Sequence, residues 1–317
     1  MRTSELHALA EPSEWKWLGL VLLDWLVIAV AMLMAAWLDH PVAFVLAAFT
    51  IAIKQHALAI LAHDGAHRLV SRTRWLNDLL TNLFCFWPLG FPLGGYRRFH
   101  FQHHRCTGTP EDPELIHKRV FKQWDVPTTS GKLSAHVLTD LLGAGIPHLA
   151  MAAYLTRAVS FLDGSAPVLF WLVITLTAWQ GGLVWIIILW WASLLLCLWP
   201  IFRLRMWTEH AGTSATHRIT AGLFARMCIV PHRTYMHWEH HEFPMIPCWN
   251  LPRVRRLVPG PQILSLPQLF QTLKNPSKDS VVHSRESCPQ DIPSKAVHEW
   301  HPSETYSKSS IRPSSAT

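Results

Sequence analysis

Residues 166–202 read APVLFWLVITLTAWQGGLVWIIILWWASLLLCLWPIF and contain no Asp, Glu, Lys or Arg. As a helix rising about 1.5 Å per residue, this stretch would measure roughly 55 Å, almost twice the hydrocarbon core of a bilayer. Gln180-Gly181-Gly182 lies near its middle and is typical of a turn. The stretch therefore predicts two membrane-spanning helices joined by a turn, the first of them short at about 15 residues.

Two further apolar stretches near the N-terminus predict a second pair of spans. Residues 17–38 contain a single charge, Asp24, and residues 41–62 contain a single charge, Lys54. Each is long enough to cross the hydrocarbon core, which needs about 20 mostly apolar residues. Only two residues separate them, so they predict a tight helical hairpin. The chain as a whole predicts an all-α integral membrane protein whose four spans form two transmembrane helical hairpins.

The basic residues predict the orientation of this fold. Two hairpins return the chain to its starting side, so residues 1–16, 63–165 and 203–317 share one face. Residues 63–165 contain many Lys and Arg residues, whereas the two short turns on the opposite side contain none. The positive-inside rule places the shared face in the cytoplasm. Residues 79–96 and 141–156 are apolar but interrupted by Pro or Gly, and we expect them to be re-entrant or interfacial instead of spanning.

Composition excludes several classes of protein. Half of the 317 residues are hydrophobic and only 15% are charged, against about 25% in ordinary soluble chains. The formal charge of +7 does not indicate nucleic-acid binding, because the basic residues flank apolar runs instead of forming a stripe. The six cysteines are scattered without a CxxC pair, which argues against a disulfide scaffold and a thiolate zinc module. We expect a cytoplasmic segment over 1–16, a membrane domain over 17–275 and a disordered, Ser-rich tail over 276–317.

Three histidine clusters lie on the face predicted to be cytoplasmic. They are HDGAH at 63–67, HFQHH at 100–104 and HWEHH at 237–241. Residues i, i+3 and i+4 share one face of a helix, so each cluster can direct its imidazoles at a common point. Eight imidazoles exceed the needs of one ion and predict a site for two. The predicted ligands are His63, His67, His100, His103, His104, His237, His240 and His241.

Imidazole ligands suit zinc, copper, iron and nickel. A closed structural zinc site is disfavoured because no thiolate set lies near the clusters. Iron that meets O2 close to a bilayer can reach the C–H bonds of a lipid chain, which makes a pair of iron ions the most specific hypothesis.

Other polar residues near the clusters have two interpretations each. His210 follows the second pair of spans and is either a ninth ligand or a structural histidine; His217 and His232 are weaker candidates. His56 lies about two helical turns before His63, so it either lines a substrate channel or is packed and hydrogen-bonded. Four carboxylates are candidate partners for imidazole N–H groups, with surface or capping roles as the alternative: Asp64, Asp112, Glu239 and Glu242.

The order HxxxH, HxxHH, HxxHH between paired spans resembles the membrane fatty acid desaturase superfamily, which also contains carotenoid hydroxylases and ketolases. The stretch from His237 to Pro247 looks like the third histidine box of that family, and Asp112-Pro113-Glu114 looks like the acidic sequel of its second box. The resemblance covers roughly residues 20–260. It implies a four-span protein with a cytoplasmic helical cap, a non-haem di-iron centre and O2 as co-substrate. It also implies that His210 completes the ligand set.

Two departures from the family pattern accompany this resemblance. Arg233 stands where many members have an Asn, and Tyr235 lies one position before the usual Tyr. Because the tail is too short and polar for a fused cytochrome b5 domain, we expect a separate electron donor such as a ferredoxin, rubredoxin or cytochrome b5. Four arginines could steer an acidic donor or simply contact lipid phosphates: Arg72, Arg74, Arg97 and Arg98. The short single-domain build favours a bacterial inner membrane over the endoplasmic reticulum.

The resemblance and the residues together predict an O2-dependent fatty acyl desaturase that introduces a double bond into a lipid acyl chain. Hydroxylation or ketolation of a carotenoid or another lipophilic substrate is the first alternative, because the same metal centre could support either outcome. A non-enzymatic membrane metal transporter is the second; it would need polar residues along its spans, and residues 166–202 have no charge. A bis-histidine haem protein is a further option.

Overall fold

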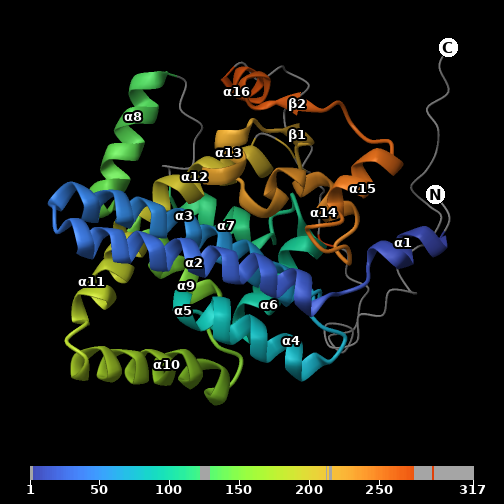
Figure 1. The fold of residues 1–317 in the computed structure, drawn as a ribbon. Helices are drawn as coiled ribbons and strands as arrows, with labels where there is room; N and C mark the ends of the chain where they lie inside the picture. The colour runs from blue at the N-terminus through green and yellow to red at the C-terminus, as the bar shows by residue number, and fades with distance from the viewer. Residues whose placement is uncertain (1–2, 122–128, 212, 214–215, 275–287, 289–317) are drawn as a thin grey trace, which may run out of the picture.

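A computed structural model describes residues 3–121, 129–211, 213, 216–274 and 288 (Figure 1). The described chain is mostly helical, and four of its helices are long and apolar enough to cross a membrane. This confirms the predicted all-α membrane protein with four candidate spans. Their arrangement across a bilayer as two hairpins below a cytoplasmic cap remains a prediction. The predicted tail lies outside the described residues apart from Cys288.

The first pair of long helices follows a short helix, α1 (Thr3–Leu9). Helices α2 (Glu14–Leu38) and α3 (Pro41–Ala66) pack side by side and are joined by Asp39 and His40 (Figure 1). Asp39 ends α2 in the left-handed region at φ 42°, and His40 Nδ1 accepts a hydrogen bond from Val42 N at the start of α3. Helix α3 continues past the predicted end of its span at residue 62, so it carries His63 within its last turn.

Short helices connect the two pairs. They are α4 (Arg74–Thr81), the π-helical turn η1 (Asn82–Phe86), α5 (Trp87–Leu89), α6 (Leu93–Cys106), α7 (Pro113–Val120), α8 (Ser130–Thr139), the π-helical turn η3 (Asp140–Ala144) and α9 (Ile146–Leu155). Residues 79–96 are broken at Gly90, which has φ 81°. The helical stretches 130–144 and 146–155 meet at a bend of 71°, as a broken span or a re-entrant loop would.

The second pair consists of α10 (Phe161–Gln180) and a helix that runs through α11 (Val184–Ala192), the π-helical turn η4 (Ser193–Cys197) and α12 (Leu198–Glu209). The predicted turn at Gly181-Gly182 is confirmed. The predicted length of the first arm is wrong: α10 has 20 residues instead of about 15. It starts earlier because the Ser160 side chain caps it, accepting a hydrogen bond from Asp163 N at 3.2 Å.

The C-terminal part packs around its own small hydrophobic core, which includes Val230, Ile246 and Leu269. Its elements are β1 (Ile219–Thr220), α13 (Leu223–Cys228), the 3-10 helix η5 (Pro231–Met236), α14 (His237–Glu242), α15 (Leu251–Leu257), β2 (Leu264–Ser265) and α16 (Leu266–Lys274). The two strands are parallel, with Ile219 opposite Leu264. This ladder is a small departure from the all-α prediction.

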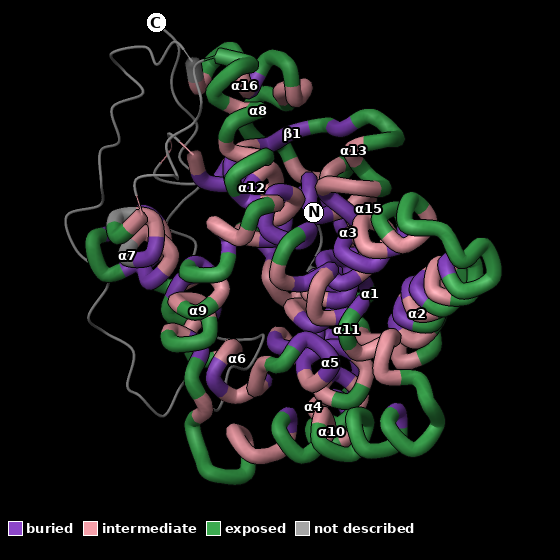
Figure 2. Tube along the Cα trace, turned by 90° about the vertical axis from the view of Figure 1, so that its left-hand side faces the viewer, coloured by how far each residue is buried: buried purple, intermediate pink, exposed green. Residues whose placement is uncertain are grey.

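Large apolar side chains cover the outside of the long helices. On α10, Val168, Leu172, Leu176 and Trp179 are all more than half exposed, and most of that helix is exposed in Figure 2. Water-soluble monomers rarely expose apolar patches of this extent. The surface therefore fits contact with lipid chains, whereas the larger core, around Ile51, Leu58 and Trp190, lies between the helices.

Candidate metal centre

The first histidine cluster lies at the C-terminal end of α3. His63 is in its last turn and His67 directly follows it. Arg97 Nε donates to Ala66 O at 2.9 Å, and the other end of its guanidinium is bonded to Asp78 at 2.6 Å. A Cβ at residue 65 would collide with the Thr81 side chain, so glycine is needed for α4 to pack this closely. These contacts fix the direction in which α3 presents its two imidazoles.

The second cluster lies in the C-terminal half of α6. The Asp163 carboxylate anchors the start of this helix by accepting from Gly94 N and Gly95 N at 3.0 and 3.1 Å. A side chain at residue 95 would collide with the Thr156 carbonyl. Tyr96 stacks on His100, with ring centroids 5.5 Å apart and planes 10° from parallel. The helix is thus held at its first turn and at its first histidine.

The third cluster occupies α14, and His210 directly follows α12. The residues that lead into α14 have an unusual backbone: His232 and Arg233 are both left-handed, with φ 46° and 65°. His232 Nε2 lies 2.6 Å from Asp24 Oδ2 on α2. The third cluster is therefore tied to the first pair of long helices through a side chain that precedes it by five residues.

All nine predicted ligands converge into two groups. The first group draws five imidazoles from three helices, and the ligand nitrogens within it lie within 4.8 Å of one another: His63, His67, His100, His104 and His240. The Nε2 atom of His100 is 2.8 Å from that of His67 and 2.9 Å from that of His104. The second group, within the same limit, contains His103, His210, His237 and His241. There the Nε2 atom of His237 is 2.9 Å from that of His210 and 3.1 Å from that of His241.

Neighbouring nitrogens about 3 Å apart fit imidazoles that share one ion at roughly 2.1 Å from each. Hydrogen bonding among the rings does not account for every nitrogen. The Nε2 atoms of His63 and His103 are buried and have no hydrogen-bond partner among the described residues. Helices α3, α6 and α12 also direct their C-terminal ends, which carry partial negative charge, towards the site. The donor set, the unpaired lone pairs and the helix ends all suit two cations.

Burial favours the neutral form, which is the form that binds metals, for most of these imidazoles. Burial and the neighbouring histidines lower the pKa values of His67, His100, His104, His237, His240 and His241 well below 6.5. His103 differs from them. Burial lowers its pKa too, but Glu114 and Asp112 outweigh that effect and raise it.

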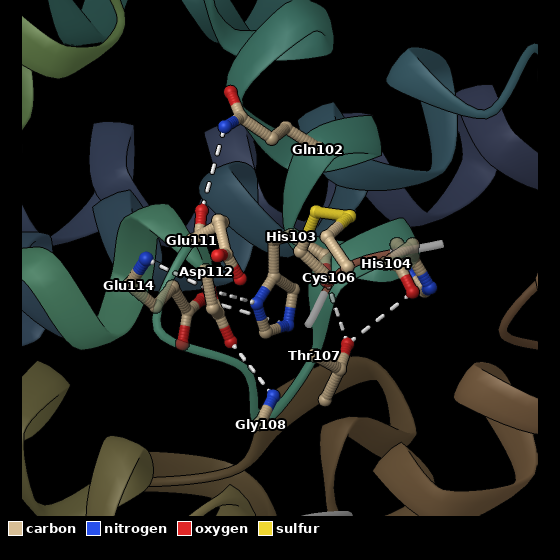
Figure 3. Close-up of a disulfide and its surroundings, with 10 residues drawn as sticks. Gln102, His103, His104, Cys106, Thr107, Gly108, Glu111, Asp112 and Glu114 are labelled. Atoms are coloured by element: carbon tan, nitrogen blue, oxygen red, sulfur yellow. Dashed lines mark hydrogen bonds and ion pairs between the residues drawn. A yellow bond between two sulfur atoms is a disulfide. The ribbon is translucent and has the colours of Figure 1, made fainter. Parts of the chain in front are cut away.

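Carboxylates orient the two groups from outside. Asp112 Oδ1 lies 2.9 Å from His103 Nδ1, and Glu114 Oε1 lies 4.0 Å from the Nε2 atom of the same ring (Figure 3). A proton on Nδ1, held by Asp112, leaves the Nε2 lone pair free for a metal. Of the four carboxylates predicted as imidazole partners, Asp112 has the direct hydrogen bond. Asp64 is 3.9 Å from His63 Nδ1 and accepts from Cys248 N.

Glu239 and Glu242 do not bond the imidazoles in the part of the chain that the structure describes. Glu239 faces away from the site and binds Arg218 and Arg255, each at 2.7 Å, while Glu242 is exposed. Sequence reasoning missed Glu209, whose Oε1 lies 3.4 Å from His237 Nδ1. The available signal in the sequence was that Glu209 directly precedes the candidate ligand His210. Glu114 was also missed as a neighbour of His103.

The remaining candidate histidines lie outside both groups. His217 Nε2 bonds the Ala211 carbonyl at 2.7 Å, and His232 bonds Asp24. His56 is fully buried in α3 with its ring edge against Phe202, 6.0 Å between centroids. The ring is therefore packed, as one alternative expected, but the hydrogen bonds expected with it are missing, because neither ring nitrogen has a partner among the described residues.

A disulfide joins Cys106, at the end of α6, to Cys288 (Figure 3). The scattered cysteines did not predict this pairing. The next residue, Thr107, donates from its hydroxyl to the His103 carbonyl at 2.7 Å, so the link lies directly beside the second cluster. Four further cysteines are free: Cys85, Cys197, Cys228 and Cys248.

A cavity of about 20 Å³ lies against the imidazoles, with room for roughly one water molecule. His63, His237 and His240 line it together with Arg205 and Arg233. It adjoins both metal groups, because His237 belongs to one group and the other two histidines belong to the other.

Comparison with known proteins agrees with this geometry. The sequence profile named "Fatty acid desaturase" matches residues 35–262, more than half of the chain. The chain belongs to the fatty acid desaturase family. The match spans all nine clustered histidines, and the protein is therefore an oxidoreductase.

Its relatives within the fatty acid desaturase family differ in their named reactions. Dihydrorhizobitoxine desaturase of Bradyrhizobium elkanii is 27% identical over 264 residues, which are 74% of this chain and 72% of that protein. The sphingolipid delta(4)-desaturase/C4-monooxygenase of Mus musculus is 29% identical over 212 residues, 64% of this chain and 62% of its own length. Beta-carotene 4-ketolase 3 of Haematococcus lacustris is 24% identical over 215 residues, 63% and 58% of the two chains.

Proposed function

We propose that this protein is an O2-dependent membrane di-iron desaturase that introduces a double bond into an acyl chain. The convergence of nine imidazoles from four segments of the chain into groups of five and four supports it most directly. The first group would hold one iron ion and the second group the other. The two ions, when bound, would supply the activation of O2. With two electrons, two protons and two hydrogen atoms taken from neighbouring carbons of the acyl chain, O2 would be reduced to two water molecules.

The residues of the chain would orient and shield this centre. Asp112 holds the His103 ring in one orientation, and Glu209 lies within reach of the His237 N–H. Five of the nine imidazoles are buried, which limits the access of bulk water to the site: His100, His103, His210, His237 and His240. If the exposed apolar helices cross a bilayer, the site would lie near the hydrocarbon from which an acyl substrate would come. The electrons would come from a separate ferredoxin, rubredoxin or cytochrome b5. This donor would bind on the cytoplasmic face of the membrane, which we propose to be a bacterial inner membrane.

Hydroxylation or ketolation is the second candidate. The observation that favours it is the presence of named ketolases and of a combined desaturase and monooxygenase among the relatives. The metal-transporter and haem alternatives lose their support, because the chain belongs to a family of oxidoreductases.

Lipid and pigment profiling tests the proposal. Cells expressing the protein are compared with cells expressing His240→Ala, with and without oxygen. A new unsaturated acyl chain that requires both oxygen and His240 supports desaturation, and an oxygenated product supports the second candidate. Iron analysis of the purified protein gives a readout that does not depend on turnover: we expect two irons per chain. A wild-type protein free of iron after loading, or a fully active His240→Ala variant, would contradict the di-iron assignment.

A further inference from the structure

We propose that a groove formed by α9, α10, α11 and the connection between α5 and α6 binds one anionic phospholipid of the surrounding bilayer. One acyl chain of this lipid would lie in the groove, with the phosphate at Arg157 and Arg98. The inference requires contact with a bilayer, which the apolar helices indicate, but not the reaction proposed above. The groove shares no described lining residue with the cavity beside the imidazoles.

The groove has the size and the lining that an acyl chain needs. Its volume is about 490 Å³, room for roughly 16 groups the size of a water molecule at about 30 Å³ each. Small residues from three separate segments leave this space open, among them Gly90, Ala153 and Gly164. Apart from Arg157, the described lining residues are apolar or aromatic. Methylenes therefore match the groove better than water or an ion does.

Two tryptophan rings form part of the apolar wall. Trp171 on α10 and Trp191 on α11 have ring centroids 4.8 Å apart. The indole N–H of Trp171 donates to the Trp87 carbonyl at 2.8 Å, so it already has a partner. Trp171 follows Gly164 by seven residues, about 10 Å along the helix axis. The groove therefore extends over two turns of α10, starting near the N-terminal end of that helix.

Two arginines lie at that N-terminal end. Arg157 lines the groove and precedes the first residue of α10 by four positions. Arg98 on α6 donates to the Arg157 carbonyl at 3.0 Å, which brings a second guanidinium to the same place. The guanidinium of Arg157 contacts Tyr154, whose carbonyl is 3.5 Å away and whose ring centroid is 5.1 Å away. Both arginines are exposed, and neither forms an ion pair with any residue that the structure describes.

The nearby carboxylate of Asp163 does not neutralise these arginines. Asp163 directly precedes Gly164 but does not line the groove. It accepts hydrogen bonds at 3.0–3.1 Å from three backbone N–H groups: Gly94, Gly95 and Val159. Two guanidinium groups are therefore left for a ligand at the end of an apolar groove.

This combination of charge and groove selects the ligand. With α10 across a bilayer, as its length and composition allow, Arg157 would lie near the level of the lipid headgroups. Guanidinium groups donate in pairs to phosphate oxygens, and basic residues next to a spanning helix favour anionic lipids. For Arg98, we therefore favour contact with a lipid phosphate over the steering of an acidic electron donor.

Lipid binding to the full-length, iron-loaded protein tests the inference. Native mass spectrometry of the delipidated protein in detergent measures the binding of dioleoylphosphatidylglycerol, dioleoylphosphatidylcholine and oleate. The wild type should bind the phosphatidylglycerol about tenfold more tightly than the phosphatidylcholine, and Arg98→Gln/Arg157→Gln should bind the two within about twofold. Arg253→Gln/Arg256→Gln, at two exposed arginines of α15, is the matched control and should keep the wild-type preference.

A second pair of variants tests the groove without changing its charge. Ala153→Phe places a ring in the groove and should weaken phosphatidylglycerol binding about tenfold. Ala36→Phe, at an exposed position of α2, should leave that binding unchanged.

Three results would overturn the inference. Equal affinities of the wild type for the two phospholipids, or a preference that survives in Arg98→Gln/Arg157→Gln, would remove the role of the arginines. Unchanged binding by Ala153→Phe would show that the chain lies elsewhere. Tighter binding of oleate than of phosphatidylglycerol would overturn the assignment to a phospholipid.

Discussion

Asp24 on α2 lies 2.6 Å from His232, a residue 208 positions later in the chain, and 2.8 Å from Lys54 on α3. Asp24 is only 1% exposed. The two charges that interrupt the first two apolar stretches therefore pair with each other, as intramembrane charges usually do. The same carboxylate also fixes the segment that leads into the third histidine cluster.

Replacing Asp24 by Asn should destabilise the protein and disturb the third cluster. The change leaves Lys54 without its counter-charge, and breaking a buried pair in this way costs roughly 3–5 kcal/mol. We expect a lower unfolding temperature in detergent and less iron per chain. Asp39→Asn is the control, because Asp39 is exposed and Asn tolerates its left-handed backbone. Equal unfolding temperatures for the two variants would contradict the role assigned to Asp24.

Glu239→Gln should also destabilise the fold. Glu239 lies next to the predicted ligand His240 in the sequence, but its own contacts are structural. Glu239 is fully buried between Arg218 and Arg255, and the neutral amide would leave two guanidiniums uncompensated. Burial alone would raise the pKa of Glu239, but the two arginines outweigh it and lower the pKa below 4.5. Its stabilisation is therefore present above about pH 4.5 and is lost as the pH falls through the lowered value. Unfolding at pH 7 should show a loss of about 3 kcal/mol, and the exposed Glu242→Gln should show almost none.

Asp112→Asn should weaken iron binding while preserving the fold. Asn can still cap α7 as Asp112 does, by accepting from Glu114 N. The amide is a poorer partner for the His103 N–H, and such changes typically cost about 10–100-fold in metal affinity. Competition with a chelator measures the affinity, and the same variant should unfold at nearly the wild-type temperature once metal is removed. Unchanged affinity would show that the His103 ring is oriented by other contacts.

The state of Cys106 and Cys288 tests the predicted topology. Because the cytosol keeps thiols reduced, both should be recovered as alkylated thiols from cells that are denatured directly in the alkylating reagent if this face is cytoplasmic, and they should pair when the protein is purified in air. Mass spectrometry of alkylated peptides measures both states, with the buried Cys85 as an internal reference. A Cys106–Cys288 link that is already complete in cells would place the histidine clusters on an oxidising side and contradict the orientation.

Much of this architecture could be predicted from local patterns. The uncharged run at 166–202 predicts two of the spans, and the spacing of the three clusters predicts eight of the nine grouped histidines. Both signals can be read locally, because hydropathy and helical periodicity are properties of neighbouring residues. His210 was ambiguous from the residues alone. It joins the second group because α12 continues to Glu209, well past the apolar run.

Contacts between distant segments could not be predicted in the same way. Nothing in the sequence near Glu239 shows that it faces Arg218 and Arg255 instead of an imidazole, and nothing near Asp24 indicates His232. The early start of α10 depends on the Ser160 cap, and the Asp163 side chain reaches α6. The parallel ladder between Ile219 and Leu264 joins two strands of two residues each, too short to leave a periodic pattern.

The division of the nine imidazoles also fixes an order of events in biosynthesis. One group needs His240 and the other needs His241, while their earliest members, His63 and His103, leave the ribosome long before. A chain whose α14 is not yet synthesised therefore holds four imidazoles of the first group and two of the second, His103 and His210. Both groups are complete only once α14 has been synthesised, and α14 follows all four long helices in the chain. If the groups bind iron as proposed, neither ion can have its full set of ligands until residue 241 has left the ribosome.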